Sequence, residues 1–113
     1  MIRLKRAYEE PGDEDGKRIL VERLWPRGLT KERAAIDLWM KDVAPSPQLR
    51  TWYSHDPAKW DEFQRRYMAE LAGKPREVES LRRLSAEGTV TFVYAARDPE
   101  RNSALVLKRV LEG

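Results

Sequence analysis

The sequence predicts a small single α/β domain over residues 1–113, with a central three-strand mixed sheet flanked by about five helices. Three observations lead to this fold class. The length is that of one domain, three short segments have the apolar patterns of strands, and helix-start signals follow the later two. Because strands followed by helices pack as layers around one core, an α/β architecture is expected.

The first two strands are expected near the N-terminus. Apolar and basic residues alternate in Ile2–Tyr8, as in a half-exposed strand, whereas Arg18–Trp25 contains the continuously apolar run Ile19–Val21. The intervening loop, Glu9–Gly16, is shorter than the dozen or more residues that a helical crossover takes. The first strand is therefore expected to pair antiparallel with the second and to lie at an edge of the sheet.

The remaining elements are one strand and five helices. Thr89–Ala95 is rich in β-branched and aromatic residues and predicts a buried central strand. Each helix is expected from apolar residues at helical spacing, and most follow a capping side chain or a proline. The expected helices are Lys31–Val43, Pro47–Tyr53, Pro57–Ala72, Pro75–Ala86 and Glu100–Leu111.

Composition excludes several functional classes. The 22 basic and 19 acidic residues nearly balance, so long-range attraction to nucleic acid would be modest. The absence of cysteine excludes disulfides, thiolate metal sites and cysteine nucleophiles. No apolar run approaches the roughly 18 residues of a membrane span, and no signal-peptide core follows the start. We therefore expect a cytoplasmic protein without a membrane partner.

No metal or cofactor is expected. The acidic run Asp13–Asp15 lacks further ligands at the spacing of a calcium loop. The chain also has neither a glycine-rich dinucleotide fingerprint nor a P-loop.

The segment Glu22–Gly28 predicts a ligand site, because it places two arginines, a tryptophan and a Pro/Gly turn after an apolar strand. Ligands of α/β proteins bind at the carboxyl ends of parallel strands, and the planar fork of arginine matches phosphate or carboxylate oxygens. If the two central strands are adjacent and parallel, their ends meet near the start of the last helix, which offers free N–H groups. The expected site for a small anionic ligand comprises Arg23, Trp25, Arg27, Tyr94, Arg97, Asp98 and Asn102.

Other interpretations of these residues remain open. In one, Arg23, Glu22 and Asp98 form an internal ion-pair network that binds nothing. In another, the protein is an enzyme in which His55, the only histidine, or Glu22 acts as a general base. No recognisable nucleophile–base pair accompanies either residue, so the sequence assigns no catalytic residue.

A third alternative is a protein associated with nucleic acid. Arg50 lies beside Trp52 and Tyr53, and these two aromatic side chains cannot both point inward from one short helix. Exposed aromatic rings interleaved with arginine can stack on bases. The nearly balanced charge favours a small ligand over this alternative.

Four motifs together resemble one known family. They are Val21-Glu22-Arg23-Leu24-Trp25-Pro26-Arg27-Gly28, Ala44-Pro45-Ser46 with Leu49-Arg50, His55-Asp56-Pro57, and Tyr94-Ala95-Ala96-Arg97-Asp98 with Asn102. The set is similar to the YeaO-like proteins, a branch of a bacterial domain-of-unknown-function family. This resemblance implies a small cytoplasmic α/β protein with no established activity.

Two departures from the family pattern affect what the resemblance implies. The family usually has aspartate where this chain has Glu22, and Asn-His-Ala where it has Asn102-Ser103-Ala104. If that histidine transfers a proton in relatives, this chain cannot use the same mechanism. A binding or structural role tolerates the change more easily.

Overall fold

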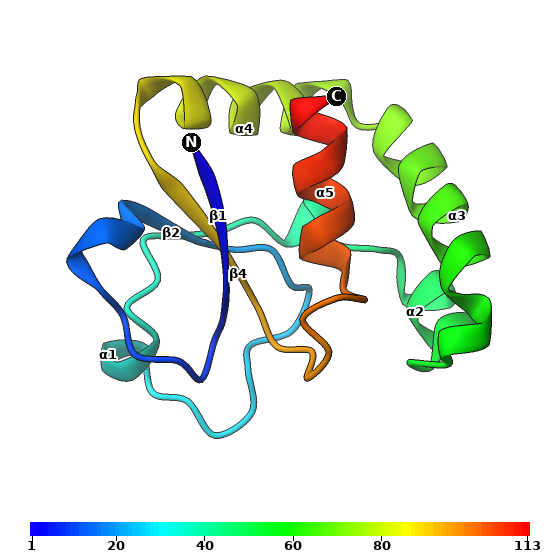
Figure 1. Cartoon of the computed structure of the whole chain (residues 1–113), viewed down its shortest axis with the longest axis horizontal. Coiled ribbons are helices and arrows are strands. Elements are labelled where there is room, and N and C mark those ends of the chain that lie inside the picture. Colours follow the sequence, from blue (N-terminus) through cyan, green and yellow to red (C-terminus); the bar gives the residue numbers. More distant parts are fainter.

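The computed structural model describes residues 1–113 and contains one four-stranded sheet in the order β1-β4-β2-β3, in which every pair of neighbours is parallel (Figure 1). The strands are β1 (Ile2–Arg6), β2 (Lys17–Leu20), β3 (Leu38–Trp39) and β4 (Val90–Tyr94). The helices are α1 (Lys31–Ala34), α2 (Pro47–Tyr53), α3 (Trp60–Ala72), α4 (Pro75–Glu87) and α5 (Ser103–Glu112). Short 3₁₀ turns are η1 (Asp13–Asp15), η2 (Lys41–Val43) and η3 (Pro57–Lys59).

The α/β class and the number of helices are confirmed, but the three-strand mixed sheet is wrong. β1 does lie at an edge, yet it runs parallel to β4, with Ile2 opposite Val90, and β4 separates it from β2. No helix is needed to return the chain between the two parallel strands. The ten residues from 7 to 16 can span about 33 Å when extended, which is about twice the length of a five-residue strand.

The prediction of a helix over Lys31–Val43 is also wrong, because Leu38–Trp39, in the middle of this range, form β3. The helix ends after one turn, at Ala35, whose φ of 50° is left-handed. Two main-chain hydrogen bonds then attach the chain to β2: the Asp37 N–H donates to the Arg18 carbonyl and the Met40 N–H to the Leu20 carbonyl, both at 2.9 Å. Sheet pairing thus prevails over an apolar spacing that also suited a helix.

The two faces of the sheet are covered differently. One face carries Ile19, Phe92 and Tyr94, which belong to the main core beneath α2, α3, α4 and α5 (Figure 1). The opposite face carries a smaller apolar cluster around Leu20 and Val93. Loop and β3 residues cover this second cluster, namely Trp25, Leu29, Ile36 and Trp39.

A buried polar network occupies the rest of the second face. Arg18 and Asp15 are 3% and 1% exposed, and Arg18 Nη1 lies 2.7 Å from Asp15 Oδ2. Arg18 Nη2 donates to the Ala34 carbonyl at 2.8 Å, and Lys5 Nζ lies 3.1 Å from the Asp15 carboxylate. The Thr91 hydroxyl donates to the Asp15 carbonyl at 2.7 Å. The network therefore connects β1, η1, β2, α1 and β4.

Gly16 allows η1 to lie against β4. Its φ of 62° is in the left-handed region, and a Cβ atom there would lie 2.1 Å from the Thr89 carbonyl oxygen. Only glycine fits this close approach.

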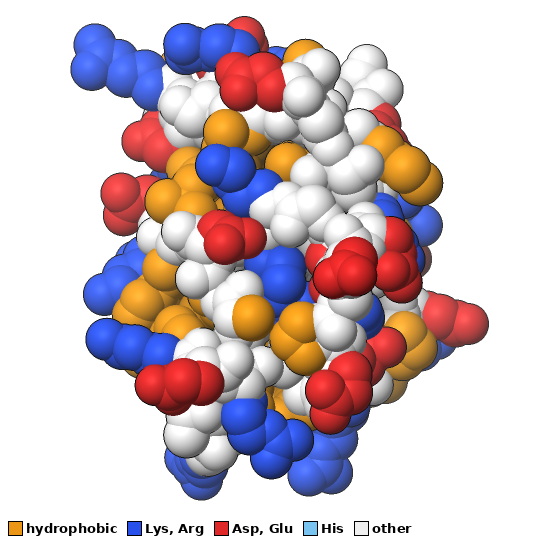
Figure 2. All heavy atoms as spheres, turned by 90° about the vertical axis from the view of Figure 1, so that its left-hand side faces the viewer, with side chains coloured by type: hydrophobic (Ala, Val, Ile, Leu, Met, Phe, Trp, Pro, Cys, Tyr) orange, Lys and Arg blue, Asp and Glu red, His pale blue; other side chains and the backbone are white.

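The surface mixes charges of both signs. Figure 2 shows the face that lies to the left in Figure 1, where acidic, basic and apolar side chains are interspersed. This distribution agrees with the small net charge of +3. None of the helices combines the length and the apolar character that a membrane crossing requires.

We expect Asp15→Asn to destabilise the protein strongly. The substitution keeps the shape of the side chain but leaves the buried guanidinium of Arg18 without its counter-charge, which costs about 3–5 kcal/mol. Urea denaturation measures the loss in the free energy of unfolding. Glu62→Gln is the control, because it removes two exposed ion pairs, with Arg65 and Arg66, and should change stability little. Equal effects of the two variants would contradict a dominant role for the network.

The contribution of Asp15 should also depend on pH. Burial acts to raise its pKa, but hydrogen bonds from the Gly12 N–H, Lys5 and Arg18 outweigh burial and hold the pKa below its ordinary value. The unfolded chain therefore takes up the proton first, at about pH 3.9. The stabilisation is complete above that pH and is lost as the pH falls through the folded pKa. The stability difference between wild type and Asp15→Asn should thus narrow from about pH 7 to about pH 3 in urea titrations; a constant difference would contradict the assignment.

Candidate functional site

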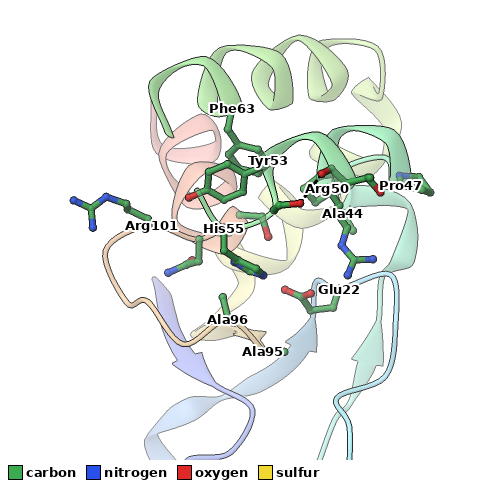
Figure 3. A pocket seen from close by; sticks show the side chains of 15 residues that line it. Glu22, Ala44, Pro47, Arg50, Tyr53, His55, Phe63, Ala95, Ala96 and Arg101 are labelled. Carbon is green, nitrogen blue, oxygen red and sulfur yellow. Dashed lines mark hydrogen bonds between the residues drawn. The ribbon is translucent and has the colours of Figure 1, made fainter. Parts of the chain in front are cut away.

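A cavity of about 480 Å³ opens at the carboxyl ends of β2 and β4, within the roughly 300–1,000 Å³ of small-molecule sites. Residues after both strands line it, together with the end of α2 and the start of α5 (Figure 3). Its polar residues come from different segments, so the folded chain brings them together. Those of interest are Glu22, Arg50, Ser54, His55, Arg101, Asn102 and Ser103.

Glu22 supplies the negative charge of the cavity. Figure 3 shows its carboxylate directed into the space between Arg50 and His55. Burial raises the pKa of Glu22, and this effect exceeds the opposing influence of the Ala95 N–H and of the positive charge of Arg50. No ion pair joins Glu22 to a basic side chain within 4 Å. A carboxylate with so few internal donors can accept a hydrogen bond from a ligand.

Arg50 supplies an available positive charge. It projects from the exposed side of α2 into the cavity wall, and its guanidinium forms neither an ion pair nor a hydrogen bond with another residue. Arg101, by contrast, is tied to Asp98, with 3.1 Å between Nη1 and Oδ2. In Figure 3 the guanidinium of Arg101 lies at the rim and points away from Glu22. Arg50 is therefore the cation best placed for a ligand.

The backbone beside Arg50 is strained. Ser54 ends α2 with a φ of 46°, and His55 follows with a φ of 56°. Both are left-handed, a conformation that costs a residue other than glycine about 1 kcal/mol or more, and such strain concentrates at functional sites. Both residues line the cavity, and the exposed imidazole of His55 forms no hydrogen bond within the chain. The two left-handed residues thus turn the histidine toward the cavity.

An aromatic wall faces Glu22 across the cavity. The rings of Tyr53 and Phe63 are stacked with centroids 4.4 Å apart, and Trp60 packs behind Phe63 at 5.7 Å. In Figure 3 the rings of Tyr53 and Phe63 lie on one side of the cavity and Ala95 and Ala96, which have small side chains, on the other. The cavity therefore combines an apolar wall with charged groups.

Asn102 is the one residue of the expected ligand site that lines this cavity. The last helix begins at Ser103 rather than at Glu100, so Asn102 is its N-cap and not one turn inside it. Its Oδ1 accepts from the Leu105 N–H at 2.9 Å, and its Nδ2 donates to the Asp98 carbonyl at 3.0 Å. Both the oxygen and the nitrogen of the Asn102 amide are therefore hydrogen-bonded within the protein.

Asp98 positions the neighbouring loop. Its carboxylate accepts hydrogen bonds from the N–H groups of Glu100 and Arg101 and pairs with the Arg101 guanidinium. The hydrogen bond from the Glu100 N–H is the largest of the effects that lower the pKa of Asp98. The alternative network of Arg23, Glu22 and Asp98 is not formed, because Asp98 is paired with Arg101 instead.

Arg23 and Trp25 do not line the cavity, and each donates to a main-chain carbonyl. Arg23 Nη2 donates weakly to the Ala44 carbonyl at 3.4 Å. Trp25 Nε1 donates to the Leu29 carbonyl at 2.7 Å, and its ring packs edge-to-face on Trp39 at 5.4 Å. Trp25 therefore covers the second face of the sheet rather than walling a ligand site.

The remaining expected residues also lie apart from the cavity lining. Arg27 and Arg97 are exposed, and the Arg27 carbonyl accepts a hydrogen bond from the Tyr8 hydroxyl at 2.9 Å. Tyr94 is buried in the main core. The two central strands are adjacent and parallel, which was the condition for the expected site. The loops that follow them nevertheless carry Arg27 and Arg97 away from the cavity, and Tyr94, the last residue of β4, belongs to the core.

The profile of a protein family described as the inactive DUF488-N3 subclade matches residues 1–113. The chain belongs to this subclade. It is 44% identical over 112 residues to an uncharacterised protein of Mycobacterium tuberculosis, covering 99% of this chain and 94% of that protein. It is 39% identical over 106 residues to the uncharacterised Escherichia coli protein YeaO, covering 94% of this chain and 92% of that protein. The resemblance to YeaO-like proteins is confirmed, and no solved structure matches.

Both departures from the usual YeaO-like pattern fall in this cavity of the DUF488-N3 chain. Glu22 lines it from the end of β2, and Ser103 lines it from the first position of α5. Arg50, which the sequence associated only with nucleic acid, and Arg101 were missed as ligand-site residues. The motif Leu49-Arg50 was the available signal for the first.

We expect His55→Gly to be more stable than His55→Ala by about 1 kcal/mol, because glycine adopts a left-handed φ without the Cβ clash. Both variants lose the imidazole, so urea denaturation isolates the backbone effect. Thr51 inside α2 is the matched control, since glycine there should be less stable than alanine by about 1 kcal/mol. The same order of stability at both positions would contradict the strained backbone at His55.

Proposed function

We propose that this protein binds a small anionic ligand, carrying a carboxylate or a phosphate, in the cavity at the ends of β2 and β4. The observation that carries the proposal is Arg50, a guanidinium in a cavity wall with no partner in the protein. Arginine binds carboxylate and phosphate oxygens through paired hydrogen bonds. We therefore assign the anion to Arg50 rather than to Arg23, Arg27 or Arg97.

The start of α5 supports the same assignment. Ser103 lines the cavity and is the first residue of a ten-residue helix, where free N–H groups and the helix dipole favour negative charge. Arg101 lies beside it at the rim. Arg50 and the α5 terminus thus border one cavity with donors, and an anion bound there would lie toward its mouth.

Binding without turnover agrees best with the comparisons, because the subclade is described as inactive. The catalytic alternative has one observation in its favour: Glu22 and His55, the two candidate bases, line the same cavity. Glu22 also has a raised pKa, which a general base requires when it works near neutral pH.

The surface favours a small ligand over nucleic acid. The Trp52 ring already lies beneath cations of its own chain, with Arg66 at 4.2 Å and Lys59 at 5.2 Å from its centroid. A base would have to displace them to stack. Tyr53 is buried, and 22 basic against 19 acidic residues give a net charge of only +3.

Inorganic phosphate, ribose 5-phosphate and simple carboxylates should raise the melting temperature, because a ligand that binds only the folded state stabilises it. We expect Arg50→Ala to weaken the binding of any such ligand by roughly 10–100-fold in calorimetry, the value of a charged hydrogen bond. Arg65→Ala is the control, since Arg65 lies on α3 and pairs with Glu62. Arg97→Ala tests the site that the sequence predicted.

Two results would count against the proposal. One is that no anion of the panel stabilises the protein. The other is that Arg50→Ala and Arg65→Ala bind the anion with equal affinity. A loss of affinity confined to Arg97→Ala would place the site in the loop after β4 instead.

A further inference from the structure

Glu22 and Arg50 carry opposite charges into one cavity without pairing. They face one another in Figure 3, and Arg50 is close enough to act on the Glu22 carboxylate. Nevertheless no ion pair within 4 Å joins them, so space remains between the two groups. A ligand that carries a cation and an anion close together can replace the water at both an opposed, unpaired carboxylate and a guanidinium.

A purely anionic ligand would leave this arrangement incomplete. Its negative charge would meet Arg50 favourably but would also face the Glu22 carboxylate, and like charges in a partly dry cavity repel. A ligand ammonium beside Glu22 removes the repulsion and supplies the donors that this carboxylate lacks. The two ligand charges must also be close together, because both protein groups border the same small space.

The aromatic wall indicates what else the ligand carries. Tyr53 and Phe63 are held as a stacked pair at 4.4 Å, supported by Trp60. On the other side lie Glu22 and the small side chains of Ala95 and Ala96, and the His55 ring borders the same space 6.0 Å from the Tyr53 ring (Figure 3). A flat or bulky apolar group of a ligand fits between these rings and the two alanines, where it contacts the rings.

We propose that the ligand is a free α-amino acid with an aromatic or large aliphatic side chain. Its ammonium donates to Glu22, its carboxylate accepts from Arg50, and its side chain packs against Tyr53. This assignment rests on the proposed function, since the carboxylate is the anion that Arg50 binds. It adds that Glu22 selects amino acids over the corresponding simple acids.

The experiment compares L-phenylalanine with 3-phenylpropionate, which lacks the ammonium, and with L-alanine, which lacks the ring. Isothermal titration calorimetry on the whole chain should give phenylalanine an affinity roughly 10-fold or more above each analogue, because phenylpropionate loses one charged hydrogen bond and alanine loses the burial of the ring. Equal affinity of phenylalanine and phenylpropionate would overturn the role of Glu22 while leaving anion binding intact. Failure of phenylalanine, phenylpropionate and phosphate alike would instead refute the proposed function.

Glu22→Gln provides a second test, with folding checked by urea denaturation. The variant keeps the shape of the side chain but loses its charge, so the ratio of phenylalanine to phenylpropionate affinity should fall toward one. Glu79→Gln is the matched control: Glu79 lies on α4, where its partner Arg82 is 3.8 Å away, and the ratio should persist. A ratio that Glu22→Gln leaves unchanged would overturn the inference, and the comparison of ligands on wild type stands whether or not the variant folds.

Discussion

The buried ion pair between Asp15 and Arg18 is the interaction on which the arrangement of the sheet depends. Burying either charge alone costs several kcal/mol, so the pair forms only when its other partners are present. The Ala34 carbonyl must accept from Arg18, and the Thr91 hydroxyl must reach the Asp15 carbonyl. Asp15 and Arg18 are close in sequence, but a different strand order would separate them from Lys5 and Thr91, which complete the buried network. The network therefore selects one topology as well as stabilising it.

That topology creates the cavity. β2 and β4 are neighbours, but the chain leaves them in different directions: after β2 it crosses to β3 at one edge, and after β4 it enters α5, which packs against β4 and β1. Because the two segments that follow these parallel strands diverge, a hollow remains between them. Glu22 and Ala95 stand at its base because they follow these two strands. The end of α2 closes the hollow with Arg50 and His55, so no single segment of the sequence contains the site.

Elements whose formation depends on neighbouring residues could be predicted from the sequence. Elements whose pairing depends on distant segments of the chain could not. Proline and capping residues gave α2, α3 and α4 close to their observed bounds, because a helix terminus is satisfied by its own neighbours. The direction of β1 depends on pairing with β4, more than eighty residues away. Trp39 fitted a helical spacing, yet it lies in β3 opposite Leu20 of β2, and its indole donates to the Glu22 carbonyl at 2.6 Å. At the site, Glu22, His55 and Asn102 were identified as chemistry-bearing residues. The role of Arg50 depends on the position of α2 relative to the carboxyl ends of β2 and β4, which the sequence does not give.

The two departures from the usual YeaO-like pattern, at Glu22 and Ser103, both concern side chains that line the cavity. Glutamate is one methylene longer than aspartate, so Glu22 carries its carboxylate further from the main chain than the family's usual aspartate would. Ser103 lines the cavity from the first position of α5 and, unlike histidine, does not titrate near neutral pH. The cavity keeps two opposed charges beside an aromatic wall. The start of α5 thus adds no titrating group to Glu22 and His55, which line the same cavity, and this agrees with the proposed binding without turnover in a subclade described as inactive.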